Sequence, residues 1–133
     1  MNLIETVFWL CLTVYYEARG ESATGQKAVC KVILNRAKAK GWEIKDIVRA
    51  RKQFSCYNDG LSSPLLRIKN IPKLIEIHET VQQAIREWQA GDTLRGATHY
   101  YAIDGMTTCR PPYWASSMEF IIEIEGHRFL RES

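Results

Sequence analysis

The sequence has little of what would assign a function class at once. Its four cysteines are widely spaced and form no CxxC pair, which argues against a zinc knuckle or a dithiol redox centre. The apolar stretch at residues 8–12 is too short to cross a membrane, and it lacks the basic flank and small-residue cleavage site of a signal peptide. Internal repeats and low-complexity segments are also missing. With 133 residues, the chain is expected to form one domain, residues 1–133, without membrane insertion.

Net charge is also small, at +3. A dedicated DNA-binding domain usually gathers lysine and arginine on one face, whereas here they are spread along the chain. Only residues 49–52 form a basic cluster, which is typical of a solvated helix end. Its alternative interpretation is attraction to a polyanion, either nucleic acid or an anionic cell envelope. We expect no nucleic-acid partner.

What the sequence does contain is an ordinary globular composition, 46% hydrophobic and 25% charged. A stripe at helical spacing runs through residues 3–17 and predicts an α-helix that Gly20 ends. Most positions from Val7 to Tyr16 are apolar, which indicates a central, buried helix. The stripe consists of Leu3, Val7, Leu10, Val14 and Glu17.

Further periodicity predicts an α+β layout, with helices first and a small antiparallel sheet after them. A second helix is expected from a cap at Ser22 or Thr24 to Gly41, with Lys27, Lys31 and Lys38 pointing outward. A short helix at residues 44–50 and a longer one from Pro72 to about Trp88 follow. Strands are predicted at 98–102, 118–125 and 128–130, the second of them alternating apolar and acidic residues.

Glu17 is the first candidate for chemistry. A carboxyl that continues an apolar stripe beside Tyr15 and Tyr16 loses hydration, which raises its pKa. An acid still protonated near neutrality can donate a proton to a leaving oxygen, as glycosidic bond cleavage requires. The structural alternative is a glutamate at a helix end, paired with Arg19 or Arg36. Glu21 is either a second catalytic or orienting carboxylate or an acid at the start of the next helix.

Carbohydrate sites combine flat aromatic platforms with amides and hydroxyls, and the sequence has such residues in three places. Each residue taken alone is more often a packing residue than a ligand contact. Neither His99 nor His127 has metal-ligand spacing to another histidine, so no metal and no cofactor are expected. The candidates are Gln53, Phe54, Ser55, His99, Tyr100, Tyr101 and Trp114.

Four ordered blocks resemble the SleB/CwlJ-type cell wall hydrolases, which include spore-cortex-lytic enzymes and phage-borne relatives. The match spans most of the chain, from about Leu10 to Phe129. The blocks are residues 13–21 (TVYYEARGE) with 25–36, residues 53–56 (QFSC), residues 97–101 (ATHYY), and Trp114 with Gly126, His127 and Phe129.

The resemblance implies a lysozyme-related and lytic-transglycosylase-like domain that cuts peptidoglycan between N-acetylmuramic acid and N-acetylglucosamine. Glu17 matches the catalytic glutamate of the family, and no second essential carboxylate is implied. The expected product is a 1,6-anhydromuramoyl end. Glu21, Gln53, Phe54, Ser55, His99, Tyr100, Tyr101 and Trp114 are expected to bind substrate or support the site. We further expect a monomer that acts at the bacterial cell wall.

Two departures from the family affect the biological setting. We expect neither an export signal nor a separate wall-binding domain, so phage-type release or another delivery route is expected. The stretch at residues 104–112 is longer than the family pattern leads us to expect, and it contains Cys109 and two prolines. The rival functions are a water-using muramidase or glucosaminidase, a non-catalytic wall-binding module, and a nucleic-acid-binding accessory protein.

Overall fold

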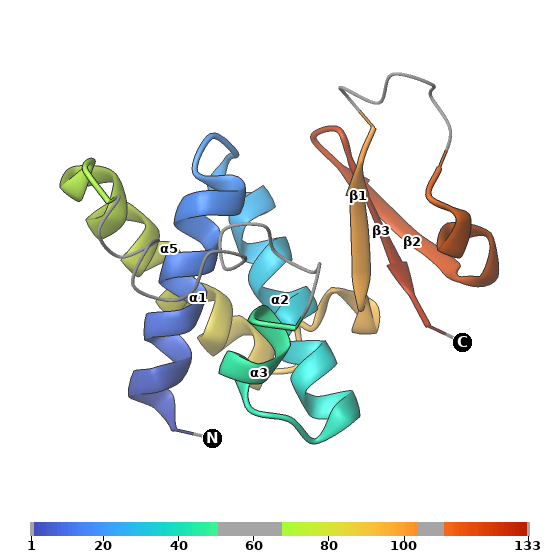
Figure 1. The fold of residues 1–133 in the computed structure, drawn as a ribbon, viewed down its shortest axis with the longest axis horizontal. Coiled ribbons are helices and arrows are strands. Elements are labelled where there is room, and N and C mark those ends of the chain that lie inside the picture. The colour runs from blue at the N-terminus through green and yellow to red at the C-terminus, as the bar shows by residue number, and fades with distance from the viewer. Residues whose placement is uncertain (1, 51–67, 104–110, 133) are drawn as a thin grey trace.

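A computed structural model describes residues 2–50, 68–103 and 111–132. Helices form one body and a three-stranded sheet stands beside it (Figure 1). The helices are α1 (Leu3–Ala18), α2 (Ala23–Lys40), α3 (Ile44–Val48) and α5 (Ile71–Gln89), with short 3-10 turns η2 (Leu94–Gly96) and η3 (Tyr113–Ser117). The strands are β1 (His99–Ala102), β2 (Glu119–Ile124) and β3 (His127–Arg131). This order confirms the predicted α+β class.

Local signals in the sequence set the helix ends. The side chain of Asn2 caps α1 by accepting from the Glu5 amide at 3.1 Å. Ser22, rather than Thr24, caps α2 and accepts from the Gly25 amide at 3.2 Å. Gly41 ends α2 in the left-handed conformation, with φ at 67°, which suits a residue without a Cβ atom.

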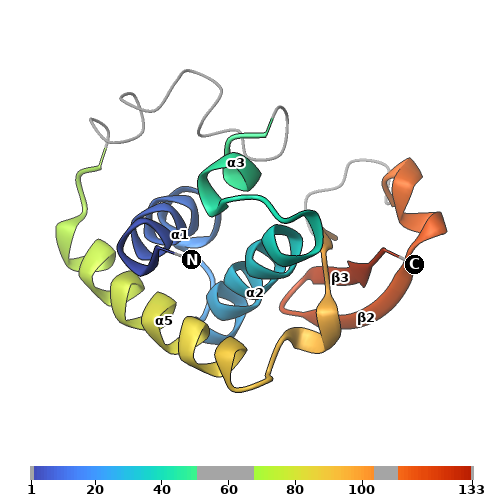
Figure 2. The ribbon, with the colours of Figure 1, turned by 90° about the horizontal axis from the view of Figure 1, so that it is seen from below.

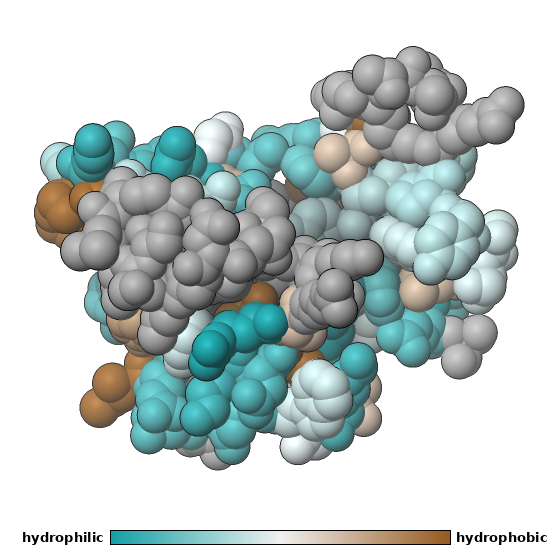
Figure 3. Space-filling model, in the orientation of Figure 1, coloured by the Kyte–Doolittle hydropathy of each residue, from teal (hydrophilic) through white to brown (hydrophobic). Residues whose placement is uncertain are grey.

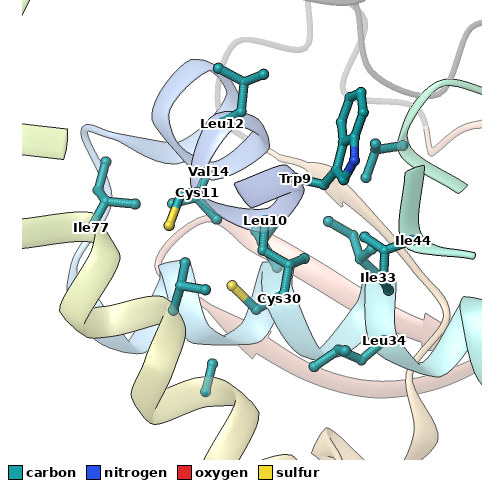
Figure 4. Close-up of a cluster of buried hydrophobic side chains, with 14 of the residues drawn as sticks. Trp9, Leu10, Cys11, Leu12, Val14, Cys30, Ile33, Leu34, Ile44 and Ile77 are labelled. Atoms are coloured by element: carbon teal, nitrogen blue, oxygen red, sulfur yellow. The ribbon is translucent and has the colours of Figure 1, made fainter. Parts of the chain in front are cut away.

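The core lies where α1 packs against α2, α3 and α5 (Figure 4). Leu10, Val14 and Ile33 are fully buried there, and each contributes roughly 1.5–3 kcal/mol by leaving water. Figure 2 shows α1 and α2 side by side, with α5 running beneath both. As expected for an apolar helix, α1 is the central element of this body. No helix in the described ranges is long and apolar enough to cross a membrane.

The central strand of the sheet is β3, which pairs antiparallel with β1 on one side and β2 on the other. A register shift between Phe120 and Ile122 makes β2 depart from simple alternation. Ile121 is buried at this point, whereas Phe120 and Ile122 are exposed. Alternation predicts that Phe120 and Ile122 share the apolar face of the strand. In the structure Ile121 enters the core in their place.

Lys31 is the second correction. It was expected to point outward, but it is buried, and its Nζ lies 2.8 Å from Glu87 and 3.0 Å from Asp92. Lys27 joins the same cluster at 2.8 Å from Glu87. Periodicity indicates which face of α2 is apolar. It does not indicate that Glu87 of α5 lies at the edge of that face and pairs with Lys31.

Candidate active site

Glu17 lies in the last turn of α1 and is partly buried, directly before the buried Ala18. Leu10 and Val14, which precede it on the same stripe, are fully buried. Glu17 therefore continues the apolar stripe to the end of α1, as the sequence pattern predicts, and its catalytic role stays a prediction.

A buried amide fixes the turn that follows. The Gln26 side chain donates to the Ala18 carbonyl at 3.1 Å and to the Glu21 carbonyl at 3.3 Å. The Glu21 amide also donates to Ala18 at 3.0 Å. Because Gln26 is itself buried in α2, the backbone between Glu17 and Glu21 is held against α2.

The β2–β3 hairpin meets this same turn. Ser22 Oγ donates to Glu125 Oε2 at 2.6 Å, and Glu21 Oε1 lies 3.9 Å from His127 Nδ1. A Cβ atom added at Gly25 would lie 3.2 Å from Glu125 Oε2, so a side chain there would require the glutamate to shift by a few tenths of an ångström. The hairpin and the end of α1 are thereby held together, although they are about a hundred residues apart in sequence.

Tyr100 of β1 belongs to the same neighbourhood. Its ring stacks on Phe129, with centroids 5.5 Å apart, and meets the His127 ring edge-on at 5.8 Å. The ring also packs against both hydrophobic clusters of the protein. Glu21, His127 and Tyr100 therefore form a continuous row beside the end of α1.

The other aromatic candidates form a separate group. Trp114 of η3 contacts His99 at 5.3 Å and Tyr101 at 6.1 Å between ring centroids. Because successive strand residues point to opposite faces, His99 and Tyr101 lie on the sheet face opposite to Tyr100. The structure thus divides the predicted aromatic residues between two faces of the sheet.

His99 has an environment unsuited to charge. Burial, together with the nearby cations Arg36 and Lys40, lowers its pKa to about 4 against the opposing effect of Glu132. Arg36 is itself anchored, since its Nε donates to the Thr98 carbonyl, and burial lowers its pKa. At neutral pH His99 is an uncharged imidazole and does not serve as a proton donor.

The sequence pattern predicts a structural role for His127 and a helix-capping role for Ser22, and it predicts no role at the site for Glu125. The Gly126–His127 pair in the last family-like block was the sequence signal that could have pointed to His127. Only the folded structure shows that His127 lies next to Glu21. The predicted residues Gln53, Phe54 and Ser55 lie outside the described residues. Within the described ranges, no three His, Cys, Asp or Glu side chains gather as a metal site.

A concave region lies between α1 and α5, away from the Glu21 turn, and has a volume of about 350 Å³. Its described lining is almost entirely apolar, and it contains no carboxyl group. Apolar surface is visible on that side of the molecule (Figure 3). Because its described lining offers no carboxyl group, it does not match the acid-catalysed glycan cleavage that the sequence predicts. The lining is Val7, Phe8, Cys11, Leu12, Ile68, Leu74, Ile75 and His78.

A helical body with a small antiparallel sheet beside it, and an acid at the end of the central helix, defines a lysozyme-like fold. Residues 20–130 match the family described as Cell Wall Hydrolase, and the chain belongs to that family. A similar solved structure is the catalytic domain of the germination-specific lytic transglycosylase SleB from Bacillus anthracis. It is 25% identical with a TM-score of 0.71, over 95% of this chain and 93% of that one. No curated protein sequence matches the chain.

Proposed function

We propose that this protein cleaves the glycan strands of peptidoglycan between N-acetylmuramic acid and N-acetylglucosamine, as a lytic transglycosylase at the bacterial cell wall. The observation that carries the proposal is the position of Glu17 in the last turn of the central helix of a cell wall hydrolase fold. Glu17 is partly buried at the C-terminal end of α1, and we assign it the role of the general acid.

In the proposed reaction the protonated Glu17 gives its proton to the glycosidic oxygen as the bond to the anomeric carbon breaks. The 6-hydroxyl oxygen of the same muramic residue then bonds to that carbon, and its proton passes to the Glu17 carboxylate. The enzyme returns to its starting state, no water is consumed, and the product ends in 1,6-anhydromuramic acid. An intramolecular hydroxyl avoids the entropy of positioning a separate water molecule.

Hydrolysis needs a second group to act as nucleophile or to position water. Among the described residues, the carboxylates at the turn after α1 are those of Glu21 and Glu125, and each already contacts a polar partner, His127 or Ser22, which favours the route without water. Glu21 is the acid that the structure places nearest along the chain, and it faces His127 across 3.9 Å. In this proposal Glu21, His127 and Tyr100 shape the site without taking part in bond making. Gln53, Phe54, Ser55, His99, Tyr101 and Trp114 remain proposed substrate contacts.

Mass spectrometry of peptidoglycan digested in ¹⁸O-labelled water tests the proposal. We expect anhydromuramic ends without label, lighter by one water than reducing ends. Label at the muramic reducing ends of most products would instead show a muramidase that uses water. Label at glucosamine reducing ends would show a glucosaminidase. Binding to peptidoglycan with no cleavage at all would show a wall-binding module.

A further inference from the structure

A groove of positive charge lies at the far end of α2 from the Glu21 turn. It has a volume of about 600 Å³ and continues into a smaller cavity of about 100 Å³, since Arg36, Lys40 and Glu132 line both. The proposed bond-breaking step uses none of its charged residues, although His99, a proposed substrate contact, lines the smaller cavity. We call it the basic groove, and its charged residues are Arg36, Lys38, Lys40, Arg131 and Glu132.

The charges of the basic groove do not cancel. Among the described residues, no carboxylate lies within 4.0 Å of Lys38 or Lys40. Arg131 is paired with Glu119. Among the described lining residues, Glu132 is then the one acid, and it faces three cations, Arg36, Lys38 and Lys40. His99 lies 3.7 Å from Glu132, but it is neutral at pH 7 and leaves that balance unchanged. The groove therefore attracts anions.

Aromatic rings hold both lysines in place. Lys40 Nζ lies 4.8 Å from the centroid of the Trp42 ring, and Lys38 Nζ lies 6.0 Å from that of Trp88. Such contacts restrict the ammonium groups before a ligand arrives, which reduces the entropy lost on binding. The shorter contact, of Lys40 with Trp42, lies at the smaller cavity, which Lys40 and Trp42 both line.

The groove is separated from the Glu21 turn by most of one helix. Arg36 lies fourteen positions after Ser22 on α2, which at 1.5 Å per residue is roughly 21 Å. Figure 1 shows the end of α2 close to α3 and the start of β1, well away from the hairpin turn. A single sugar could not contact both places, but a polymer can.

We propose that the basic groove binds the free carboxylates of a peptide stem on a muramic residue several sugars away from the bond being cut. This inference rests on the proposed function. The sugars of the strand carry no charge of their own, so the stems supply the anions. Glu132 within the groove repels a polyphosphate, whereas a stem that also carries a free amine gives Glu132 a cation to bind.

The test uses soluble glycan strands free of phosphate polymers, either with intact stems or with the stem carboxylates converted to neutral amides. We call the second kind stripped strands, because the chemical blocking removes the stem charge without exposing the lactyl carboxylates of the muramic residues. The variant is Lys38→Gln/Lys40→Gln, and the matched control is Lys45→Gln, an exposed lysine of α3 outside the groove. We expect the double variant to raise KM on stem-bearing strands by about 3–10-fold without changing kcat. On stripped strands it should equal the wild type. Equal effects on both substrates, or no effect on either, overturn the proposal.

Binding measured in a Glu17→Gln background separates this inference from the proposed reaction. Anisotropy of labelled strands should show tighter binding of stem-bearing than of stripped strands, with the difference lost in the lysine double variant and reduced by salt. That result supports the groove even if cleavage fails. Competition by polyglycerol phosphate but not by free stem peptide overturns it in favour of a phosphate ligand. If the double variant unfolds, Lys38→Arg/Lys40→Arg should keep the discrimination, and losing it overturns the proposal.

Discussion

At the scale of single residues, Glu17 carries the proposed chemistry. Glu17→Gln keeps the size and helix propensity of the side chain but removes its titratable proton. We expect activity to fall by roughly 100-fold or more, because general acid catalysis typically contributes 10²–10⁴-fold. Turbidity loss of a peptidoglycan suspension measures activity, and circular dichroism checks the fold. A folded variant that kept more than about a tenth of the activity would rule Glu17 out as the acid.

Glu21 is expected to behave differently. Its carboxylate lies 3.9 Å from the His127 ring, and its backbone is held by Gln26 whatever the side chain is. Glu21→Gln should therefore lower activity only in part, by less than about 10-fold, and should leave the anhydro product unchanged. A folded Glu21→Gln protein with no activity would indicate a mechanism with two carboxylates, or the wrong choice of acid.

Two independent features of the sequence identify Glu17 as the candidate acid: it continues an apolar helical stripe, and it lies in a family-like motif. The sequence did not reveal that Glu21 and His127 face each other, since a contact between residues so far apart depends on how the hairpin docks. Gly25 belongs to one of the family-like blocks. The structure adds a steric observation, because Glu125 approaches closely and a Cβ atom at this position would lie 3.2 Å from its Oε2.

At the scale of elements, periodicity predicted the helices and strands to within a few residues. It was weaker wherever one element alters the environment of another. The bulge at Ile121 depends on how β2 pairs with β3, and the burial of Lys31 depends on where α5 crosses α2. Neither feature follows from the local pattern of polar and apolar residues.

The contact between α2 and α5 leads to a prediction about pH. Hydrogen bonds from Lys27 and Lys31 lower the pKa of Glu87, so this carboxylate stabilises the folded protein at pH values above its unfolded pKa of about 4.3. That stability is lost as pH falls through the lowered folded pKa. Glu87→Gln should destabilise the protein by about 1–2 kcal/mol at pH 7, because Lys31 then keeps only Asp92.

Urea unfolding at pH 7 and near pH 3 measures this difference, which should be smaller at the lower pH. The matched control is Glu76→Gln, which removes the same charge from α5. Glu76 is well exposed and contacts Lys73 at 3.5 Å, so its loss should cost less than about 0.5 kcal/mol. Equal effects of the two variants at pH 7 would show that the Glu87 cluster behaves as ordinary surface charge.

At the scale of the whole molecule, α2 belongs to two cores at once. Ile33 and Leu34 pack into the cluster formed by the helices, whereas Ala28 and Val32 pack with Phe129 and the sheet. Tyr100 contacts both clusters. We propose that the helical body and the sheet are one cooperative domain. This arrangement places the hairpin against the end of α1, so cooperativity bears directly on the site.

Two neighbouring substitutions on α2 test this cooperativity. Val32→Ala opens a cavity on the sheet side and Ile33→Val on the helix side, at expected costs of about 1.5–3 and 0.5–1.5 kcal/mol. Fluorotryptophan signals from Trp9 and Trp114 report on the helical core and the sheet during urea unfolding. In one cooperative domain, each substitution shifts both signals to a lower urea concentration by the same amount. If Val32→Ala shifted the Trp114 signal and left that of Trp9 in place, the sheet would be a separate unit. The alignment of His127 with Glu21 would then vary independently of the helical body.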